Sequence, residues 1–257
     1  MNNGPVGVFD SGLGGISVLR EIKKLMPDEK YIYYGDSLNA PYGTRTDEDV
    51  FNLTHNVFTT LMDKGVKAVI IACNTATSVA VRRLRAEYPS VPIVGMEPAI
   101  KPASEENKGG RVVVMATPVT LRRPKFVTKM DKYSEIAEIV PMPAPGIVRY
   151  IESGKLHDEG LREYINGLFE GLEGRPADAV VLGCTHFPFA ADIIQEAAGP
   201  QARLYDGSLG TAKELRRRMI EQDLLCSGTE ESTVEIMNSA GEEQAELSRK
   251  LFTGEIS

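Results

Sequence analysis

The stretches "AVIIACNT" (residues 68–75) and "AVVLGCTH" (residues 179–186) decide how this chain folds. Each is a short apolar run that ends in a cysteine followed by polar residues, which predicts a buried strand leading into a turn or helix. Strands without polar alternation are typical of parallel sheets covered by helices on both faces. The two cysteines lie 184 − 73 = 111 residues apart, so we expect one structural unit to occur twice.

Strands and helices alternate around the first of these stretches. Strands are predicted at residues 5–10, 31–36, 67–73 and 91–96, with helices at 15–26, 47–65 and 77–88. This order predicts an α/β fold with a mostly parallel sheet.

The second half repeats this pattern after a segment rich in proline, glycine and charge at residues 97–110. An apolar run at 111–120 followed by a helix, further helices at 147–154 and 159–172 and a strand at 177–184 are predicted, with a proline-rich passage at 140–146. The last part predicts a helix, a strand and a helix at 211–225, 232–239 and 241–252, too short to form a core alone. We therefore expect two pseudosymmetric lobes, residues 1–97 with 207–257 and residues 98–206, each a mostly parallel sheet flanked by helices.

The composition excludes several classes of protein. Among 257 residues, 42% are hydrophobic and 25% are charged, as in ordinary globular proteins. No apolar run approaches the roughly 18 residues of a membrane span, and the start of the chain lacks a secretory signal. We expect a cytoplasmic protein without a membrane partner. The net charge of −7 argues against a nucleic-acid partner, and three cysteines without a CxxC pair predict neither a disulfide framework nor a metal site.

The positions of Cys73 and Cys184 suggest their chemistry. A cysteine between a buried strand and a helix lies near unpaired backbone N–H groups, which favour the thiolate. Ligands of open parallel sheets bind at the carboxyl ends of the strands, so we expect the two thiols on opposite walls of one cleft. Two bases on opposite sides of a substrate suit racemisation. The alternative is acyl transfer by Cys184 with His186, although residues two apart face each other only in a special turn.

Four motifs together resemble the glutamate racemases: "GVFDSGLGG" (7–15), "YYGDSLNAPYGTRT" (33–46), "IACNTATSVAV" (71–81) and "LGCTHFPF" (182–189). They are spread over most of the chain. The resemblance implies cofactor-independent interconversion of L- and D-glutamate, a supply of D-glutamate for peptidoglycan, and a homodimer. No lysine has a convincing pyridoxal phosphate context, so hydrogen bonds must stabilise the carbanion.

The resemblance also implies roles for individual residues. Cys73 is similar to the thiol that acts on D-glutamate, with Asp10 beside it, and Cys184 to the thiol that acts on L-glutamate, with His186 beside it. Glu152 matches an acidic position near the active-site entrance, and Thr117 matches a contact of the second lobe. The implied substrate contacts are Asp10, Ser11, Tyr42, Gly43, Asn74, Thr75, Thr185 and His186.

Other interpretations stay open. The "GLGG" stretch (12–15) has neither the P-loop nor the full dinucleotide-binding spacing, so a tight turn is favoured over a phosphate site. Asp36 is either an anchor of its loop, through Tyr42, or part of the site. The rival functions are a racemase or decarboxylase for aspartate, hydantoin or arylmalonate, and a solute-binding module without chemistry.

Overall fold

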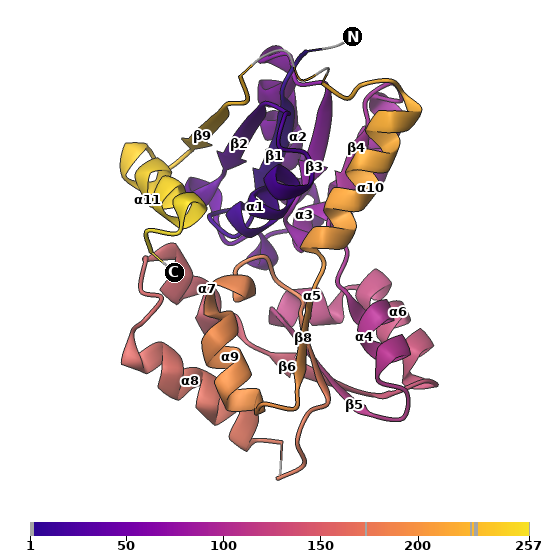
Figure 1. Ribbon diagram of the computed structural model, residues 1–257, viewed down its shortest axis with the longest axis vertical. Helices are drawn as coiled ribbons and strands as arrows, with labels where there is room; N and C mark the ends of the chain where they lie inside the picture. The colour runs from indigo at the N-terminus through magenta and orange to yellow at the C-terminus, as the bar shows by residue number, and fades with distance from the viewer. Residues whose placement is uncertain (1–2, 173, 227, 229–230, 257) are drawn as a thin grey trace. The chain divides into compact units, whose positions relative to one another are not determined.

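The computed structural model describes residues 3–172, 174–226, 228 and 231–256. It contains two compact units, Met1–Glu97 with Ser208–Ile256, and Pro98–Gly207. Each unit contains one sheet in which all strand pairs are parallel (Figure 1). The expected α/β class is confirmed.

The first unit has the strand order β4-β3-β1-β2-β9. These strands are β1 (Val6–Asp10), β2 (Tyr31–Gly35), β3 (Ala68–Ile71), β4 (Ile93–Gly95) and β9 (Val234–Asn238). All strands and helices predicted up to residue 96 are present.

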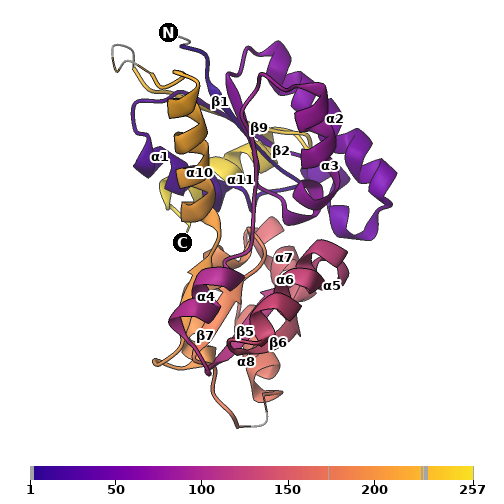
Figure 2. The same ribbon diagram turned by 90° about the vertical axis from the view of Figure 1, so that its right-hand side faces the viewer.

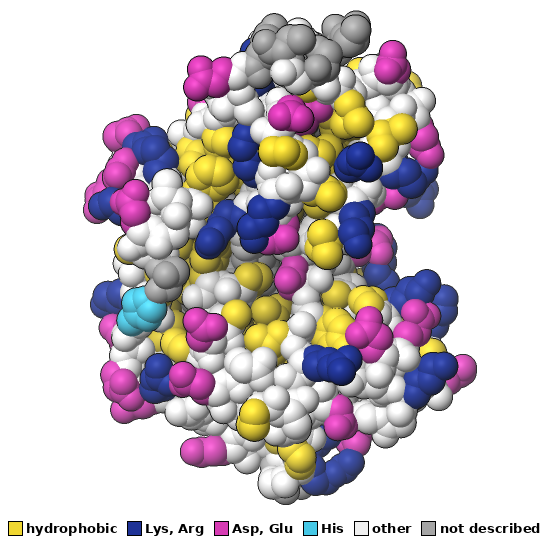
Figure 3. Space-filling view, viewed as in Figure 1, with side chains coloured by type: hydrophobic (Ala, Val, Ile, Leu, Met, Phe, Trp, Pro, Cys, Tyr) yellow, Lys and Arg dark blue, Asp and Glu magenta, His cyan; other side chains and the backbone are white. Residues whose placement is uncertain are grey.

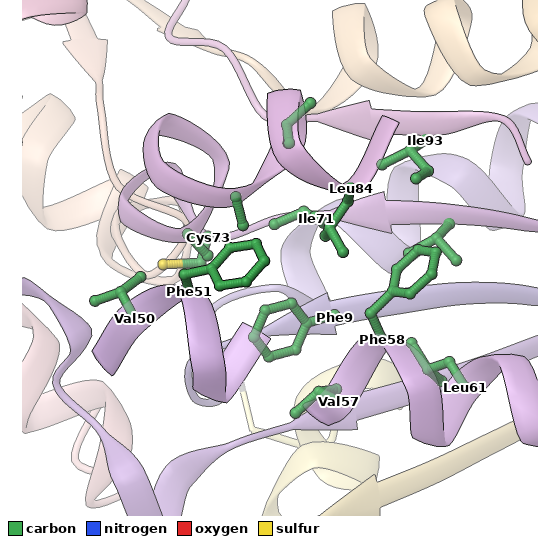
Figure 4. Close-up of a cluster of buried hydrophobic side chains, with 14 of the residues drawn as sticks. Phe9, Val50, Phe51, Val57, Phe58, Leu61, Ile71, Cys73, Leu84 and Ile93 are labelled. Carbon is green, nitrogen blue, oxygen red and sulfur yellow. The ribbon is translucent and has the colours of Figure 1, made fainter. Parts of the chain in front are cut away.

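Helices cover both faces of this sheet. Figure 2 shows α1 (Ile16–Leu25) and α10 (Ser208–Glu221) on one side, and α2 (Asp47–Asp63) and α3 (Asn74–Glu87) on the other. Alternate residues of each strand therefore enter different cores. Phe9 and Ile71 face α2 and α3, where they pack in one buried cluster with Phe58 and Leu84 (Figure 4).

The end of the chain returns to this first unit, as predicted. Strand β9 pairs with β2 at the edge of the sheet, from Tyr31↔Val234 to Gly35↔Asn238. The last helix, α11 (Glu242–Thr253), packs against β9 and α1. The C-terminal segment is too short to form a core alone, and it is stabilised by packing on the first sheet.

The second unit has the strand order β6-β5-β7-β8. Its strands are β5 (Arg111–Ala116), β6 (Glu138–Pro143), β7 (Ala179–Leu182) and β8 (Arg203–Asp206). Its helices are α4 (Ile100–Glu106), α5 (Pro118–Arg122), α6 (Pro124–Ser134), α7 (Pro145–Glu152), α8 (Glu159–Glu170) and α9 (Ala191–Ala198).

Strands β6 and β8 and helices α4 and α9 of the second unit were not predicted, and the single helix expected after the apolar run at 111–120 is two helices, α5 and α6. Strand β6 includes Pro141 and Pro143 of the proline-rich passage, and β8 is a short strand with exposed ends. Both are edge strands, where one row of N–H groups needs no partner and proline is tolerated. Helix α4 forms within the segment expected as a boundary, with Pro102 in its first turn, where no N–H donor is needed.

The topology supports the expected pseudosymmetry. Reading β4-β3-β1-β2 in the first unit and β8-β7-β5-β6 in the second gives every strand of the second sheet a counterpart in the first, where only β9 is additional. The register agrees, because Phe9 lies beside Ile71 as Met115 lies beside Leu182. Hence β3 and β7, which precede the two cysteines, occupy the same place in their sheets.

Charged side chains of both signs are interspersed on the face shown in Figure 3. On α10, for example, Arg217 and Arg218 both pair with Glu214. Within the described ranges, no helix is both long and apolar enough to span a membrane.

Candidate active site

Cys73 caps the amino end of α3, two residues after β3 ends. Its carbonyl accepts the first helical hydrogen bond, from Thr77 N at 2.8 Å. The residue is 8% exposed and belongs to the cluster of Figure 4, at the carboxyl end of the sheet. Unpaired N–H groups and the positive end of the helix dipole stabilise a thiolate at such a position.

The segment after β1 reaches the Cys73 sulfur. Ser11 Oγ donates to Cys73 Sγ at 3.3 Å. Asp10, the last residue of β1, is fully buried, and one of its oxygens accepts a hydrogen bond from Gly12 N at 3.0 Å. Because Ala72 N donates to Phe9 O at 2.7 Å, Asp10 lies beside the residues that lead to Cys73.

Tyr42 and Gly43 form a short 3-10 helix (Tyr42–Thr44) in the loop after β2. The Tyr42 hydroxyl donates to Asp36 Oδ2 at 2.7 Å, which confirms Asp36 as an anchor of this loop. Burial, the hydrogen bond to Asp36 and the charges of Asp36, Cys73 and Asp10 raise the pKa of Tyr42 well above its ordinary value. The phenol is therefore neutral and committed to Asp36, which leaves backbone N–H groups as the donors available at this turn.

Asn74 and Thr75 are the first two residues of α3. Thr75 is buried and Asn74 is partly buried. Their place directly after Cys73 means that any group bound at the sulfur meets the first turn of the helix. Such a turn presents N–H groups to a carboxylate.

Cys184 occupies the corresponding place in the second unit. It follows β7 and Gly183, whose N–H donates to Met115 O at 2.7 Å. A Cβ at Gly183 would lie 2.5 Å from that same carbonyl, so only glycine fits before this cysteine. Unlike Cys73, Cys184 leads into a turn and a 3-10 helix (Phe187–Ala190) before α9 begins.

This turn brings His186 back to Cys184. The distance from Cys184 Sγ to His186 Nδ1 is 3.5 Å, although the two residues are only two apart. The other ring nitrogen, Nε2, lies 2.5 Å from Glu152 Oε1. Sequence reasoning required a special turn for a Cys-His contact, and Phe187 N bonding to Cys184 O at 3.1 Å closes that turn.

The charge state of His186 follows from these contacts. Burial alone lowers its pKa, but hydrogen bonds and charges from Cys184 and Glu152 outweigh burial and hold the pKa well above its usual value. This shift favours the protonated imidazolium, which faces the sulfur on one side and a carboxylate on the other. Such an imidazolium can stabilise negative charge on sulfur or donate a proton.

Glu152 reaches this site from the end of α7. The start of α7 is packed tightly on α8, because a Cβ at Gly146 would lie 2.7 Å from the Tyr164 ring. Gly146 N also donates to the Tyr164 hydroxyl at 3.1 Å. The sequence indicated Glu152 only through a family resemblance, since no spacing links positions 152 and 186.

The remaining predicted residues fall beside these two centres. Thr185 is buried next to Cys184. Thr117 follows β5 and caps α5, where its hydroxyl accepts from Thr120 N at 3.3 Å. Among the residues that the structure describes, no group of three or more His, Cys, Asp or Glu side chains could hold a metal ion.

The structure thus gathers two sets of the predicted residues, one in each unit. One set comprises Asp10, Ser11, Tyr42, Gly43, Cys73, Asn74 and Thr75, and the other comprises Glu152, Cys184, Thr185 and His186. A residue that sequence reasoning missed is Tyr33, whose buried hydroxyl donates to Gly12 O at 2.6 Å. The signal for this residue in the sequence is the apolar run "YIYYG". A tyrosine that is fully buried in such a run needs a hydrogen-bond partner for its hydroxyl.

Comparison with known proteins agrees with this arrangement. The family model described as Asp/Glu/Hydantoin racemase matches residues 7–215. The chain belongs to this racemase family. It is 45% identical to a glutamate racemase of Clostridium perfringens over 98% of this chain and 97% of the relative. A glutamate racemase of Clostridium botulinum is 46% identical, with 97% of each chain covered.

The fold is shared with a solved member of the family. The structure of Escherichia coli glutamate racemase in complex with L-glutamate and the activator UDP-MurNAc-Ala superposes with a TM-score of 0.84 at 27% identity, covering 98% of this chain and 95% of that one. The resemblance found in the sequence motifs is confirmed, as is the expectation of a racemase.

Proposed function

We propose that this enzyme interconverts L- and D-glutamate, with Cys73 and Cys184 as its two acid/base groups and no organic cofactor. The observation that carries the proposal is that each cysteine follows an equivalent strand and has its own polar partner. Ser11 contacts the Cys73 sulfur, and His186, backed by Glu152, contacts the Cys184 sulfur. Near-complete coverage by glutamate racemases at 45% identity supports the choice of substrate.

Proton transfer in this scheme is balanced between the two sulfurs. Cys73, as thiolate, removes the α-proton of D-glutamate, and the C–H bond is exchanged for an S–H bond. Cys184, as thiol, gives its proton to the opposite face of the carbanion and becomes a thiolate. The reverse direction starts from Cys184, and both cysteines exchange their protons with solvent between turnovers.

The two thiols have different support for this exchange. His186 is an imidazolium that stabilises the Cys184 thiolate left after proton donation. Cys73 has a neutral hydroxyl donor, Ser11, and the buried Asp10 beside its strand. We therefore propose Asp10 as the assisting carboxylate of the first thiol and His186 as the assisting group of the second.

Substrate binding is assigned to neutral donors. Hydroxyl and amide groups and the N–H groups at Tyr42 and Gly43 suit two carboxylates and an ammonium without adding a competing charge. Hydrogen bonds to the carboxylate next to the α-carbon strengthen as the carbanion forms, which lowers the barrier. The proposed side-chain donors are Ser11, Asn74, Thr75 and Thr185.

The biological context completes the proposal. We infer that the product D-glutamate serves peptidoglycan synthesis and that the enzyme is a cytoplasmic homodimer. The relative from Escherichia coli supports the first point, since a peptidoglycan precursor, UDP-MurNAc-Ala, is named as its activator.

The test is a circular dichroism assay of purified enzyme with either glutamate enantiomer and no added cofactor. Decay of the signal from both enantiomers is expected, and aspartate serves as the comparison substrate. Cys73→Ala and Cys184→Ala should each abolish decay while the melting temperature shows a folded protein. Turnover by either variant, or faster decay with aspartate than with glutamate, would contradict the proposal.

A further inference from the structure

Two tyrosines of β2 hold the two ends of α1. Tyr31 and Tyr33 are both buried, and the hydroxyl of each reaches a backbone carbonyl next to α1. The Tyr31 hydroxyl donates to Met26 O, just after α1, at 2.6 Å. The Tyr33 hydroxyl donates to Gly12 O, just before α1, also at 2.6 Å. The two hydrogen bonds have equal length and similar burial, but only the second lies at the carboxyl end of the sheet.

Gly12, the acceptor of the Tyr33 hydroxyl, is linked to the Cys73 site in two ways. Its own N–H donates to Asp10 Oδ1 at 3.0 Å. The residue before it, Ser11, donates from Oγ to Cys73 Sγ at 3.3 Å. A movement of Gly12 therefore displaces both groups that support the first thiol.

The space around this hydrogen bond leaves Gly12 little freedom. A Cβ at Gly35 would lie 2.6 Å from Gly12 O and 3.2 Å from the Tyr33 ring. A Cβ at Gly15 would lie 2.6 Å from Asp10 Cβ and 3.1 Å from the Tyr33 ring. The Gly12 carbonyl thus lies against bare backbone on β2, and the Tyr33 hydroxyl fixes its direction.

We propose that Tyr33 is a positioning residue for the Cys73 half-reaction, acting through Gly12 on Asp10 and Ser11. The inference rests on the proposed function, in which Cys73 exchanges a proton with D-glutamate. Tyr33 acts through its hydrogen bond to the Gly12 carbonyl. Its contribution is to hold the loop at residues 11–12 in the geometry that proton transfer requires, since small displacements of supporting groups slow catalysis strongly.

The test compares Tyr33→Phe with Tyr31→Phe, a matched control that removes an equivalent buried hydroxyl from the same strand. Enantiomers have equal free energy, so kcat/KM must be the same in both directions for every variant. Tyr33→Phe should lower this value about tenfold, whereas Tyr31→Phe should stay near wild type. Both variants should lower the melting temperature by similar amounts.

Isotope effects separate positioning from loss of folded enzyme. If the Cys73 step becomes more rate-limiting in Tyr33→Phe, the primary deuterium isotope effect on kcat/KM rises with 2-deutero-D-glutamate and falls toward unity with 2-deutero-L-glutamate. A merely structural role leaves both isotope effects at their wild-type values. Gly35→Ala, which pushes on the same Gly12 carbonyl, should shift them in the same sense and provides a second variant.

The outcomes distinguish this inference from the proposed function. A wild-type enzyme that does not racemise glutamate, or a Cys73→Ala variant that does, contradicts the proposed function. If wild type is active and Cys73→Ala is inactive, isotope effects in Tyr33→Phe equal to those of Tyr31→Phe overturn the positioning role alone. An opposite shift, larger with 2-deutero-L-glutamate, would also overturn it.

Discussion

His186 Nε2 lies 2.5 Å from Glu152 Oε1, while the other nitrogen of the same ring lies 3.5 Å from the Cys184 sulfur. The imidazole therefore joins a carboxylate at the end of α7 to a thiol after β7. Sulfur, imidazolium and carboxylate form a row of alternating charge whenever Cys184 is a thiolate. The protonation state of His186 therefore depends on both Cys184 and Glu152.

Removing the Glu152 charge should change the pH dependence of activity. In Glu152→Gln, the attraction that helps to raise the pKa of His186 is lost, so the imidazolium loses its proton at lower pH. The alkaline limb of the kcat profile should move to lower pH, and kcat at the maximum should fall at least about tenfold. Glu163→Gln, an exposed carboxylate on α8, is the control. An unmoved limb would show that Glu152 does not set the protonation of His186.

The same contact predicts a pH-dependent stability. Because the folded-state pKa of His186 lies above its unfolded value of about 6.5, folding takes up a proton between the two pKa values. The stabilisation is fully present below about pH 6.5 and is lost as pH rises through the folded-state pKa. The melting temperature of His186→Asn should therefore depend less on pH over this alkaline range than that of wild type. Parallel melting profiles of the two proteins would contradict the charged state of His186.

Asp10→Asn and His186→Asn should slow opposite half-reactions. Both should lower kcat/KM equally in the two directions, as thermodynamics requires, by about 10- to 1,000-fold. The isotope effect should rise with 2-deutero-D-glutamate in Asp10→Asn and with 2-deutero-L-glutamate in His186→Asn. Competitive racemisation of labelled and unlabelled substrate measures both values. The same direction of change in both variants would argue against separate partners for the two thiols.

Hydrogen exchange with solvent tests the two-base scheme. With L-glutamate in heavy water, Cys184 takes up protium and Cys73 delivers deuterium from solvent. Early D-glutamate should therefore carry deuterium, while the remaining L-glutamate stays nearly unlabelled. Mass spectrometry of the separated enantiomers at low conversion gives the result. Appreciable protium in the first D-glutamate would instead indicate a single base that returns the hydrogen it removed.

The sequence by itself determined the central strands and the place of the two thiols. Strands β3 and β7 are apolar on both faces and end at a cysteine, a local pattern that does not depend on distant residues. The family motifs surround these strand ends, so the motifs alone were enough to identify Asp10, Cys73, Cys184 and His186 as candidates. A strand that is buried on both faces can be recognised from its own apolar residues.

The tertiary structure alone decided the edges of the second sheet and the partners of the thiols. Strands β6 and β8 are recognisable only by the neighbours they pair with, because an edge strand tolerates proline and exposed polar ends. Two contacts arise where separate elements end side by side. Ser11 contacts Cys73 across 62 positions of the chain, and Glu152 contacts His186 across 34 positions. Local periodicity specifies which face of a strand is buried, but only the packed fold determines which polar groups meet at its end.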